Sequence, residues 1–108
     1  MNRYPTEEEL EKIEKWEVNS IEDYREFMYY IHNIWEFSDW GWSTEKDIYF
    51  ISTGGWSGNE DIIASMKHNR MFWIMYWYQS KRGGHYIFAP SSLESDDIIE
   101  AKNKIEEQ

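Results

Sequence analysis

Cysteine is absent from the chain, and this absence removes two classes of small protein. A disulfide-bonded framework and a zinc site with thiolate ligands both require cysteine side chains. The 108 residues must therefore be stabilised by a hydrophobic core. Surface scaling indicates that a chain of this length can bury about two thirds of its unfolded accessible area, so a core of sufficient size can form. A chain without cysteine also fits a reducing compartment.

Long apolar runs are absent as well. No stretch approaches the roughly 18 apolar residues of a membrane-spanning helix, and the opening MNRYPTEEEL lacks the apolar segment of a signal peptide. Only two prolines occur, and no Pro/Gly/Ser-rich linker divides the chain. We therefore expect a single domain over residues 1–108, soluble and cytoplasmic, with no membrane partner.

Positive charge is scarce, because 11 Lys and Arg stand against 21 Asp and Glu, and the net charge is −10. The acidic excess lies at the two ends: residues 1–26 carry nine acids and four bases, and residues 94–107 carry six and two. The middle, 27–93, is nearly balanced and holds the basic clusters KHNR (67–70) and SKRGGH (80–85). Such a chain repels a phosphate backbone, so we expect no direct binding to nucleic acid.

The acidic ends have two interpretations. Glutamate is a good helix former, and these residues can simply solvate the outer faces of two helices. Alternatively, they form a negative surface that docks on a basic protein. Aromatic residues are also abundant, with seven Trp, eight Tyr and five Phe, and we expect some of the rings at the surface. The predicted partner-binding residues are Glu7, Glu8, Glu11, Glu14, Trp40 and Trp42.

Capping patterns predict the helices. A capping box at Thr6 and Glu9 begins a first, peripheral helix. Ser20 caps a second helix whose apolar residues recur at steps of three and four, so we expect it to be central and to pack across a sheet. Near the end of the chain, Ser91 and Glu94 have the spacing of a capping box for a last helix.

The stretch STGGWSGNEDII, residues 52–63, has glycines where a phosphate-binding loop would have them. Such a loop needs Lys and then Ser or Thr after its last glycine, but Gly58 is followed by Asn and two acids. We interpret SGNE as a capping box of Ser57 and Glu60 that begins a short helix over about 58–68, and TGGW as a turn. An anion site at this helix end is the alternative.

Four strands are predicted. Residues 39–43 and 47–53 form a first hairpin. Residues 71–79 are apolar at both odd and even positions, which predicts a central strand covered on both faces and paired antiparallel with 85–89. The expected fold is an α+β domain of order ααββαββα, with an approximately four-stranded, mainly antiparallel sheet packed with helices.

The histidines show no metal-ligand spacing, and no nucleophile signature accompanies them, so we predict no catalytic residue, metal or cofactor. The SKRGGH turn is either a solvated turn or one side of a ligand site. If this turn and the TGGW turn lie at one end of the sheet, an aromatic ring and basic side chains face the same anion. The predicted ligand-binding residues are Trp56, Lys81, Arg82 and His85.

The motifs GWSGNEDII, FWIMYW and SKRGGHYIF, within about residues 40–90, resemble a group of small proteins encoded by bacteriophages and prophages. The group is functionally uncharacterised, so the resemblance implies a phage protein in the host cytoplasm without assigning catalytic residues. Small acidic phage proteins of this size often resemble counter-defence proteins in composition, and this analogy is the basis for considering such a role.

The sequence therefore predicts a non-enzymatic, phage-type binding protein that occupies a host protein through an acidic and aromatic surface. A counter-defence inhibitor is the role that the analogy in composition suggests. A protein that binds or sequesters a small anionic or nucleotide ligand is the first alternative, and an enzyme of unrecognised type is the second.

Overall fold

Helix α2 (Ile21–Ile34) forms the centre of the molecule. Its residues Tyr24, Phe27, Met28 and Ile31 recur at helical spacing and are buried. Ser20 begins the helix as predicted, because its Oγ accepts a hydrogen bond from the backbone nitrogen of Asp23 at 3.1 Å. The computed structural model describes residues 4–107, so residues 1–3 and 108 of the predicted domain lie outside the described residues.

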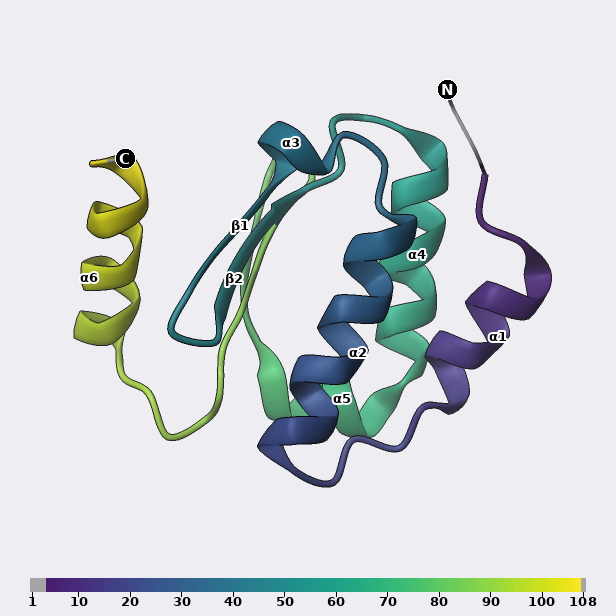
Figure 1. Ribbon diagram of the computed structural model, residues 1–108, viewed down its shortest axis with the longest axis horizontal. Coiled ribbons are helices and arrows are strands. Elements are labelled where there is room, and N and C mark those ends of the chain that lie inside the picture. The colour runs from purple at the N-terminus through teal and green to yellow at the C-terminus, as the bar shows by residue number, and fades with distance from the viewer. Residues whose placement is uncertain (1–3, 108) are drawn as a thin grey trace.

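The sheet consists of two hairpins joined side by side (Figure 1). Strands β1 (Trp42–Glu45) and β2 (Ile48–Ser52) form the first hairpin, and β3 (Trp77–Lys81) and β4 (His85–Phe88) form the second. All pairings are antiparallel, and the strand order β1-β2-β4-β3 leaves β1 and β3 at the edges. The α+β class and the order of the main elements are confirmed.

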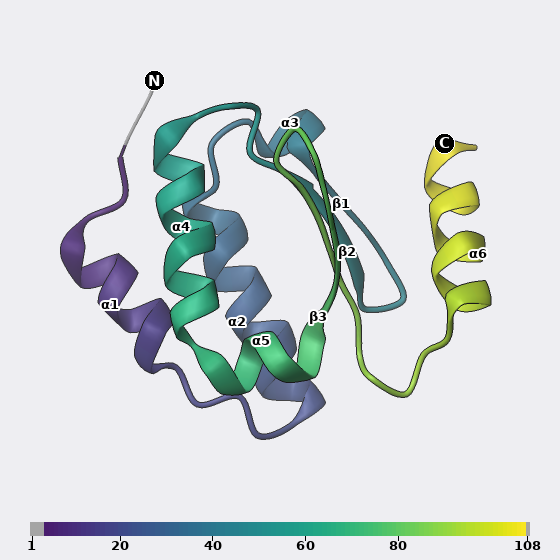
Figure 2. The ribbon, with the colours of Figure 1, turned by 180° about the vertical axis from the view of Figure 1, so that it is seen from behind.

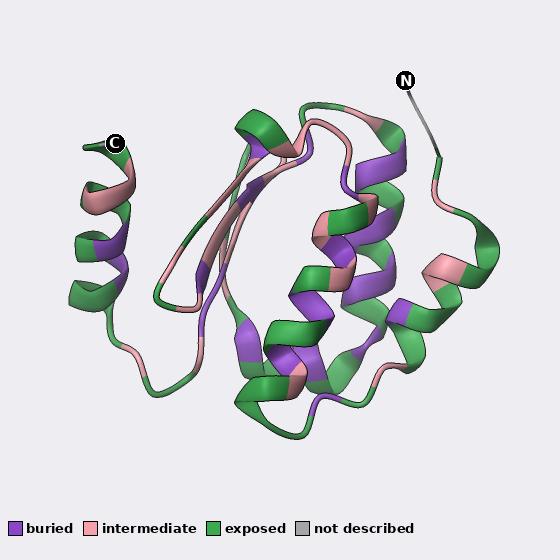
Figure 3. Ribbon diagram, in the orientation of Figure 1, coloured by how far each residue is buried: buried purple, intermediate pink, exposed green. Residues whose placement is uncertain are grey.

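Helices cover both faces of the sheet (Figures 1 and 2). On one face, Ile51 and Phe88 join the main core with α2, α4 (Ser57–His68) and α5 (Arg70–Tyr76). On the other face, Ile48 packs in a second cluster with residues of α6 (Ser95–Glu106). Helix α1 (Glu7–Lys15) packs outside α4. Figure 3 shows the buried residues on the inner sides of these layers.

The predicted central strand at 71–79 is wrong. The segment is helix α5 as far as Tyr76, and the strand that follows lies at the edge of the sheet. The pairing of this strand with β4 is as predicted. The helix forms because Asn69 caps it, accepting a hydrogen bond from the backbone nitrogen of Phe72 at 3.2 Å. Phe72 and Tyr76 then point into the core from successive turns.

The first hairpin is shorter than predicted. Residues Ser38–Gly41 form the short helix α3, so β1 begins only at Trp42. A left-handed backbone at Phe37, with φ of 64°, precedes this helix and redirects the chain. The turn also lies later than the predicted residues 44–46: it is formed by Lys46 and Asp47, whose φ angles of 52° and 66° suit a tight hairpin.

Of the three predicted capping boxes, the one at Thr6 and Glu9 is present. The box at Ser57 and Glu60 is not formed, because α4 already begins at Ser57 and its preceding residue is Trp56. The hydroxyl of Ser57 instead pairs with that of Tyr4 at 2.9 Å.

The predicted start of the last helix is also wrong. Helix α6 begins at Ser95, and its capping box uses Glu94 and Asp97 in place of Ser91 and Glu94. The backbone nitrogen of Glu94 donates to the Asp97 carboxylate at 2.9 Å. A carboxylate at the cap accepts the same backbone hydrogen bond as a hydroxyl, so the helix starts three residues later than the serine pattern indicates.

Candidate binding surfaces

A groove of about 920 Å³ lies between helix α2 and the edge strand β1. Both elements face the viewer in Figure 1. Five of the twelve lining residues are Trp or Tyr, one is Met and six are polar or charged, so aromatic rings and polar groups occur together as they do in binding pockets. The lining residues are Trp16, Arg25, Glu26, Met28, Tyr29, Tyr30, His32, Asn33, Trp42, Thr44, Asp47 and Tyr49.

The floor of the groove comes from the first hairpin. Alternate residues of a strand point to one face, and so Trp42 and Thr44 lie on the face of β1 that meets α2. Tyr49 lies opposite Thr44 on β2. The Trp42 ring packs edge-on against Trp35 at 5.7 Å and against His32 at 5.0 Å. These two contacts hold Trp42 in a defined orientation.

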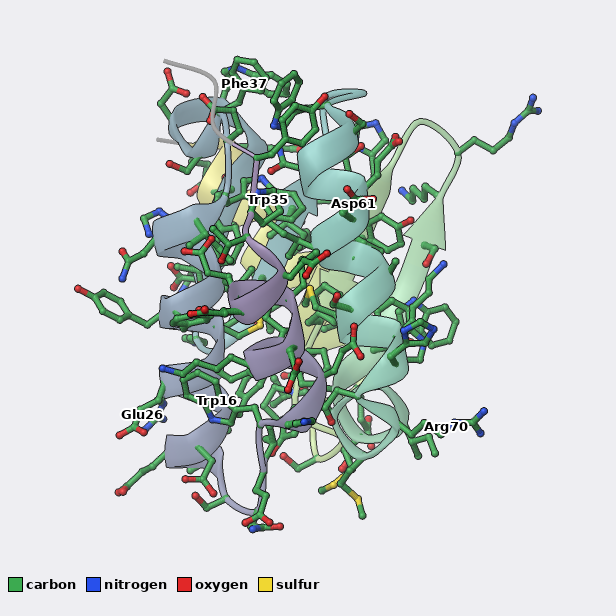
Figure 4. All side chains as sticks on the ribbon, turned by 90° about the vertical axis from the view of Figure 1, so that its right-hand side faces the viewer. Trp16, Glu26, Trp35, Phe37, Asp61 and Arg70 are labelled. Carbon is green, nitrogen blue, oxygen red and sulfur yellow. The ribbon has the colours of Figure 1, made fainter. Side chains whose placement is uncertain are left out.

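The wall of the groove is the outer face of α2 together with the end of α1. Tyr29 projects from this wall and is 68% exposed. Trp16, which ends α1, packs against Tyr30 with 5.3 Å between ring centroids. The ammonium of Lys12 lies over the Tyr30 ring at 4.7 Å. Trp16 and Glu26 lie on the same side of the molecule in Figure 4, so aromatic and acidic groups adjoin there.

An ion pair closes one end of the groove. The Nε and Nη2 atoms of Arg25 donate to the two carboxylate oxygens of Asp47 at 2.9 and 2.8 Å. The Tyr24 hydroxyl donates to the backbone oxygen of Asp47 at 2.7 Å, and burial raises the pKa of Tyr24 well above its usual range. The turn of the first hairpin is therefore fixed to α2 by three hydrogen bonds. Asp47 offsets the charge of Arg25 within the lining, and Glu26 adds a negative charge near the Lys12 ammonium of the wall.

Of the six predicted partner-binding residues, only Trp42 lines this groove. Trp40 is exposed and stacks on Phe37 with 5.6 Å between ring centroids, beside Gly54.

The four predicted glutamates lie exposed on α1, and two of them already have partners within the protein. Glu11 accepts a hydrogen bond from Lys15 at 2.6 Å, and this bond lowers the pKa of the Glu11 carboxyl. Glu14 accepts one from Ser65 at 3.1 Å. Glu7 and Glu8 lie in the first turn of the helix, where acidic side chains interact favourably with the positive end of the helix dipole.

The two glycine turns lie at the same end of the sheet, which is the arrangement that the predicted ligand site requires. The backbone nitrogen of Thr53 donates to the backbone oxygen of Gly84 at 3.0 Å. A Cβ on Gly84 would lie 2.2 Å from the Thr53 hydroxyl, and its φ is 78°, so only glycine fits there.

Trp56 does not join the other predicted ligand-binding residues in a pocket. Its ring packs against Tyr4 with 4.8 Å between centroids, and its buried Nε1 makes no hydrogen bond with the described residues. Lys81 and His85 line a separate pocket of about 290 Å³ between the sheet and α6, where Arg82 is not among the lining residues. The pocket also contains Ser52 and Lys102, which sequence reasoning missed because no local pattern connects α6 with the hairpin.

Within residues 4–107, no three His, Asp or Glu side chains are grouped so that they could hold a metal ion. None of the helices in this part of the chain is long and apolar enough to cross a membrane.

Comparison with known proteins gave no match: no family model fits the chain, and no curated protein or solved structure is significantly similar to it. The resemblance to phage-encoded proteins therefore stays a prediction. The function has to be argued from the groove, the pocket and the charges around them.

Proposed function

We propose that this protein acts without catalysis, by binding an extended segment of a host protein in the groove between α2 and β1. The observation that carries this proposal is an aromatic groove of about 920 Å³ beside an unpaired sheet edge. In the phage setting that the resemblance implies, such binding would occupy the host protein and so counter its defence function.

The edge strand favours an extended partner. Among the described strands, only β2 pairs with β1, so outward-facing backbone groups along β1 have no partner strand. A peptide that adds to such an edge gains main-chain hydrogen bonds, and every second side chain points into the neighbouring groove. Here those side chains would meet Trp42 and Thr44 on the floor and Tyr29 on the wall.

Charge favours a basic partner. The chain carries a net charge of −10, and Arg25, the only Lys or Arg of residues 4–107 in the groove lining, is paired with Asp47. A segment that alternates Lys or Arg with large apolar residues would complement both the acidic surroundings and the aromatic lining. Aromatic side chains are frequent anchors in protein interfaces, so Tyr29 and Trp42 are the expected points of strongest contact.

The test is selection from a display library of random linear peptides, followed by kinetic measurement of the selected peptides. We expect enrichment in basic and large apolar residues. Tyr29→Ala and Thr44→Arg should each weaken binding at least about tenfold, which corresponds to about 1.4 kcal/mol, mainly through faster dissociation. Ile99→Ala is the matched control, because Ile99 is similarly exposed but lies on α6. Absence of enriched peptides, or equal effects of all three variants, would contradict the proposal.

A second measurement separates the groove from the acidic helix α1. Replacing Glu7, Glu8, Glu11 and Glu14 together by glutamine removes four exposed charges. If these charges only steer a basic partner, association slows and depends less on salt, whereas the dissociation rate stays unchanged. A large increase in the dissociation rate would instead place the contact on α1, against the groove proposal.

A further inference from the structure

A row of polar side chains crosses three strands on the face of the sheet opposite the groove. Ser52 of β2 pairs with His85 of β4, and His85 pairs with Lys81 of β3. Residues directly opposite each other in an antiparallel sheet point to the same face. The neighbouring row on that face contains Phe50 and Ile87, which pack against the α6 cluster. The polar row is therefore continuous with the space between the sheet and α6.

Helix α6 completes this row as a pocket by adding Lys102. The cavity holds about 290 Å³, close to the lower end of the range for small-ligand sites. Neither Lys81 nor Lys102 forms an ion pair with another described residue, although the chain has an excess of ten acids. Two exposed lysines without carboxylate partners among the described residues thus line one cavity.

The imidazole of His85 lines this pocket, is exposed, and is held by its neighbours. Its Nδ1 lies 2.6 Å from the Ser52 hydroxyl, a hydrogen bond in which either group can donate. Its Nε2 lies beside the hairpin turn, 3.2 Å from the position that a Cβ on Gly83 would occupy. The φ of 92° at Gly83 also favours glycine. The turn sequence therefore keeps the ring between β2 and the turn, which reduces the ordering that a ligand must impose.

We infer that this pocket binds a phosphate group. Phosphate carries up to two negative charges and several acceptor oxygens, which match two lysine side chains together with the one donor that the hydrogen-bonded Ser52–His85 pair leaves free. Phe50 and Ile87 provide an apolar floor for whatever the phosphate is attached to. The overall negative charge disfavours a nucleic-acid backbone, so the ligand class is a small phosphorylated molecule or free phosphate. The site is independent of the α2–β1 groove and of its proposed partner.

Amide NMR of the full chain tests this inference at neutral pH, with inorganic phosphate and adenosine monophosphate as probes and chloride at matched ionic strength as reference. We expect saturable shifts confined to the amides of Ser52, Lys81, His85 and Lys102. Lys102→Met should weaken phosphate binding at least about fivefold. Lys104→Met is the control on the same helix, because Lys104 lies near Glu100 and outside this pocket.

The two probes distinguish the sources of the phosphate group. Tighter binding of adenosine monophosphate than of phosphate supports a phosphorylated ligand held partly by Phe50, and equal affinities support recognition of phosphate alone. The inference is overturned if chloride produces the same shifts, or if Lys102→Met and Lys104→Met change phosphate binding equally. Neither result depends on peptide binding in the groove, so this site and the proposed function fail or stand separately.

Discussion

Two buried asparagines fasten the loops of this protein to its helices. Asn59 accepts from the backbone nitrogen of Glu36 at 2.9 Å and donates to the backbone oxygens of Glu36 and Thr53 at 2.8 and 3.2 Å. Asn69 donates to the backbone oxygens of Ile13 and Trp16 at 2.9 and 2.8 Å and caps α5. Both side chains are fully hydrogen-bonded, as buried polar groups must be to avoid a desolvation penalty.

Replacing Asn69 by alanine should therefore lower the free energy of unfolding by about 2 to 4 kcal/mol. Loss of the cap costs about 1 kcal/mol, and the carbonyls left without a donor cost about 1 to 3 kcal/mol more. Urea unfolding measures the change. Asn33→Ala is the control, because Asn33 is exposed on α2 and its loss should change the free energy by less than about 0.5 kcal/mol. Similar values for the two variants would show that the Asn69 hydrogen bonds contribute little.

At the scale of elements, α5 is apolar on all sides, but only one side is buried. Phe72 and Tyr76 lie in the core, whereas Met71, Ile74 and Met75 are exposed. A strand over the same residues would place Phe72 and Ile74 on one face, because side chains of a strand alternate. The helix separates them, since residues two apart on a helix do not share a face.

This difference yields a direct test of the element type. Phe72 is fully buried, and Phe72→Ala should reduce the free energy of unfolding by about 3 to 5 kcal/mol. Ile74 is 79% exposed, and Ile74→Gln should change it by less than about 0.5 kcal/mol. Chemical denaturation of both variants gives the two values. A large loss for Ile74→Gln would support the strand in place of the helix.

At the scale of the whole molecule, tyrosines from separate elements meet in the core. Tyr24 of α2 stacks on Tyr76 of α5 with 4.0 Å between ring centroids, and it meets Tyr49 of β2 edge-on at 5.6 Å. Burial raises the pKa of all three hydroxyl groups. Proton binding by these groups therefore differs between the folded and unfolded states only at alkaline pH.

We expect the free energy of unfolding to fall as the pH rises above about 10. Unfolded tyrosines ionise near that pH, whereas folded Tyr24 keeps its proton because its pKa is raised, so alkali favours the unfolded state. The stabilising contribution is complete below pH 10 and is lost progressively above it. Each pH unit above 10 costs about 1.4 kcal/mol for one such group. Urea unfolding between pH 7 and pH 11 measures this slope.

Tyr24→Phe is the informative variant for this pH dependence. At pH 7 it removes the hydrogen bond to Asp47, at a cost of about 1 kcal/mol. Above pH 10 its slope should be shallower than that of the parent, because phenylalanine has no proton to lose. Parallel slopes for Tyr24→Phe and the parent would exclude Tyr24 as a source of the alkaline loss.

Interactions between residues close in the chain determined much of the fold from the sequence alone. The cap at Thr6, the cap at Ser20 and the glycines of the KRGG turn act over a few residues, and the structure shows all three. The α+β class follows from these local elements. The capping boxes predicted at Ser57 and Ser91 failed because a second acceptor or partner lay nearby, and spacing alone does not show which one the chain uses.

Contacts between distant residues decided the rest, and this is the part that concerns function. Asn69, which caps the helix at residues 70–76, is held in place by its hydrogen bond to the backbone of Ile13, 56 residues away in the chain. The groove exists because α2 packs beside β1, and the basic pocket exists because α6 brings Lys102 to His85. These contacts between elements depend on how the helices pack on the sheet, and the spacing of residues within one element does not predict that packing.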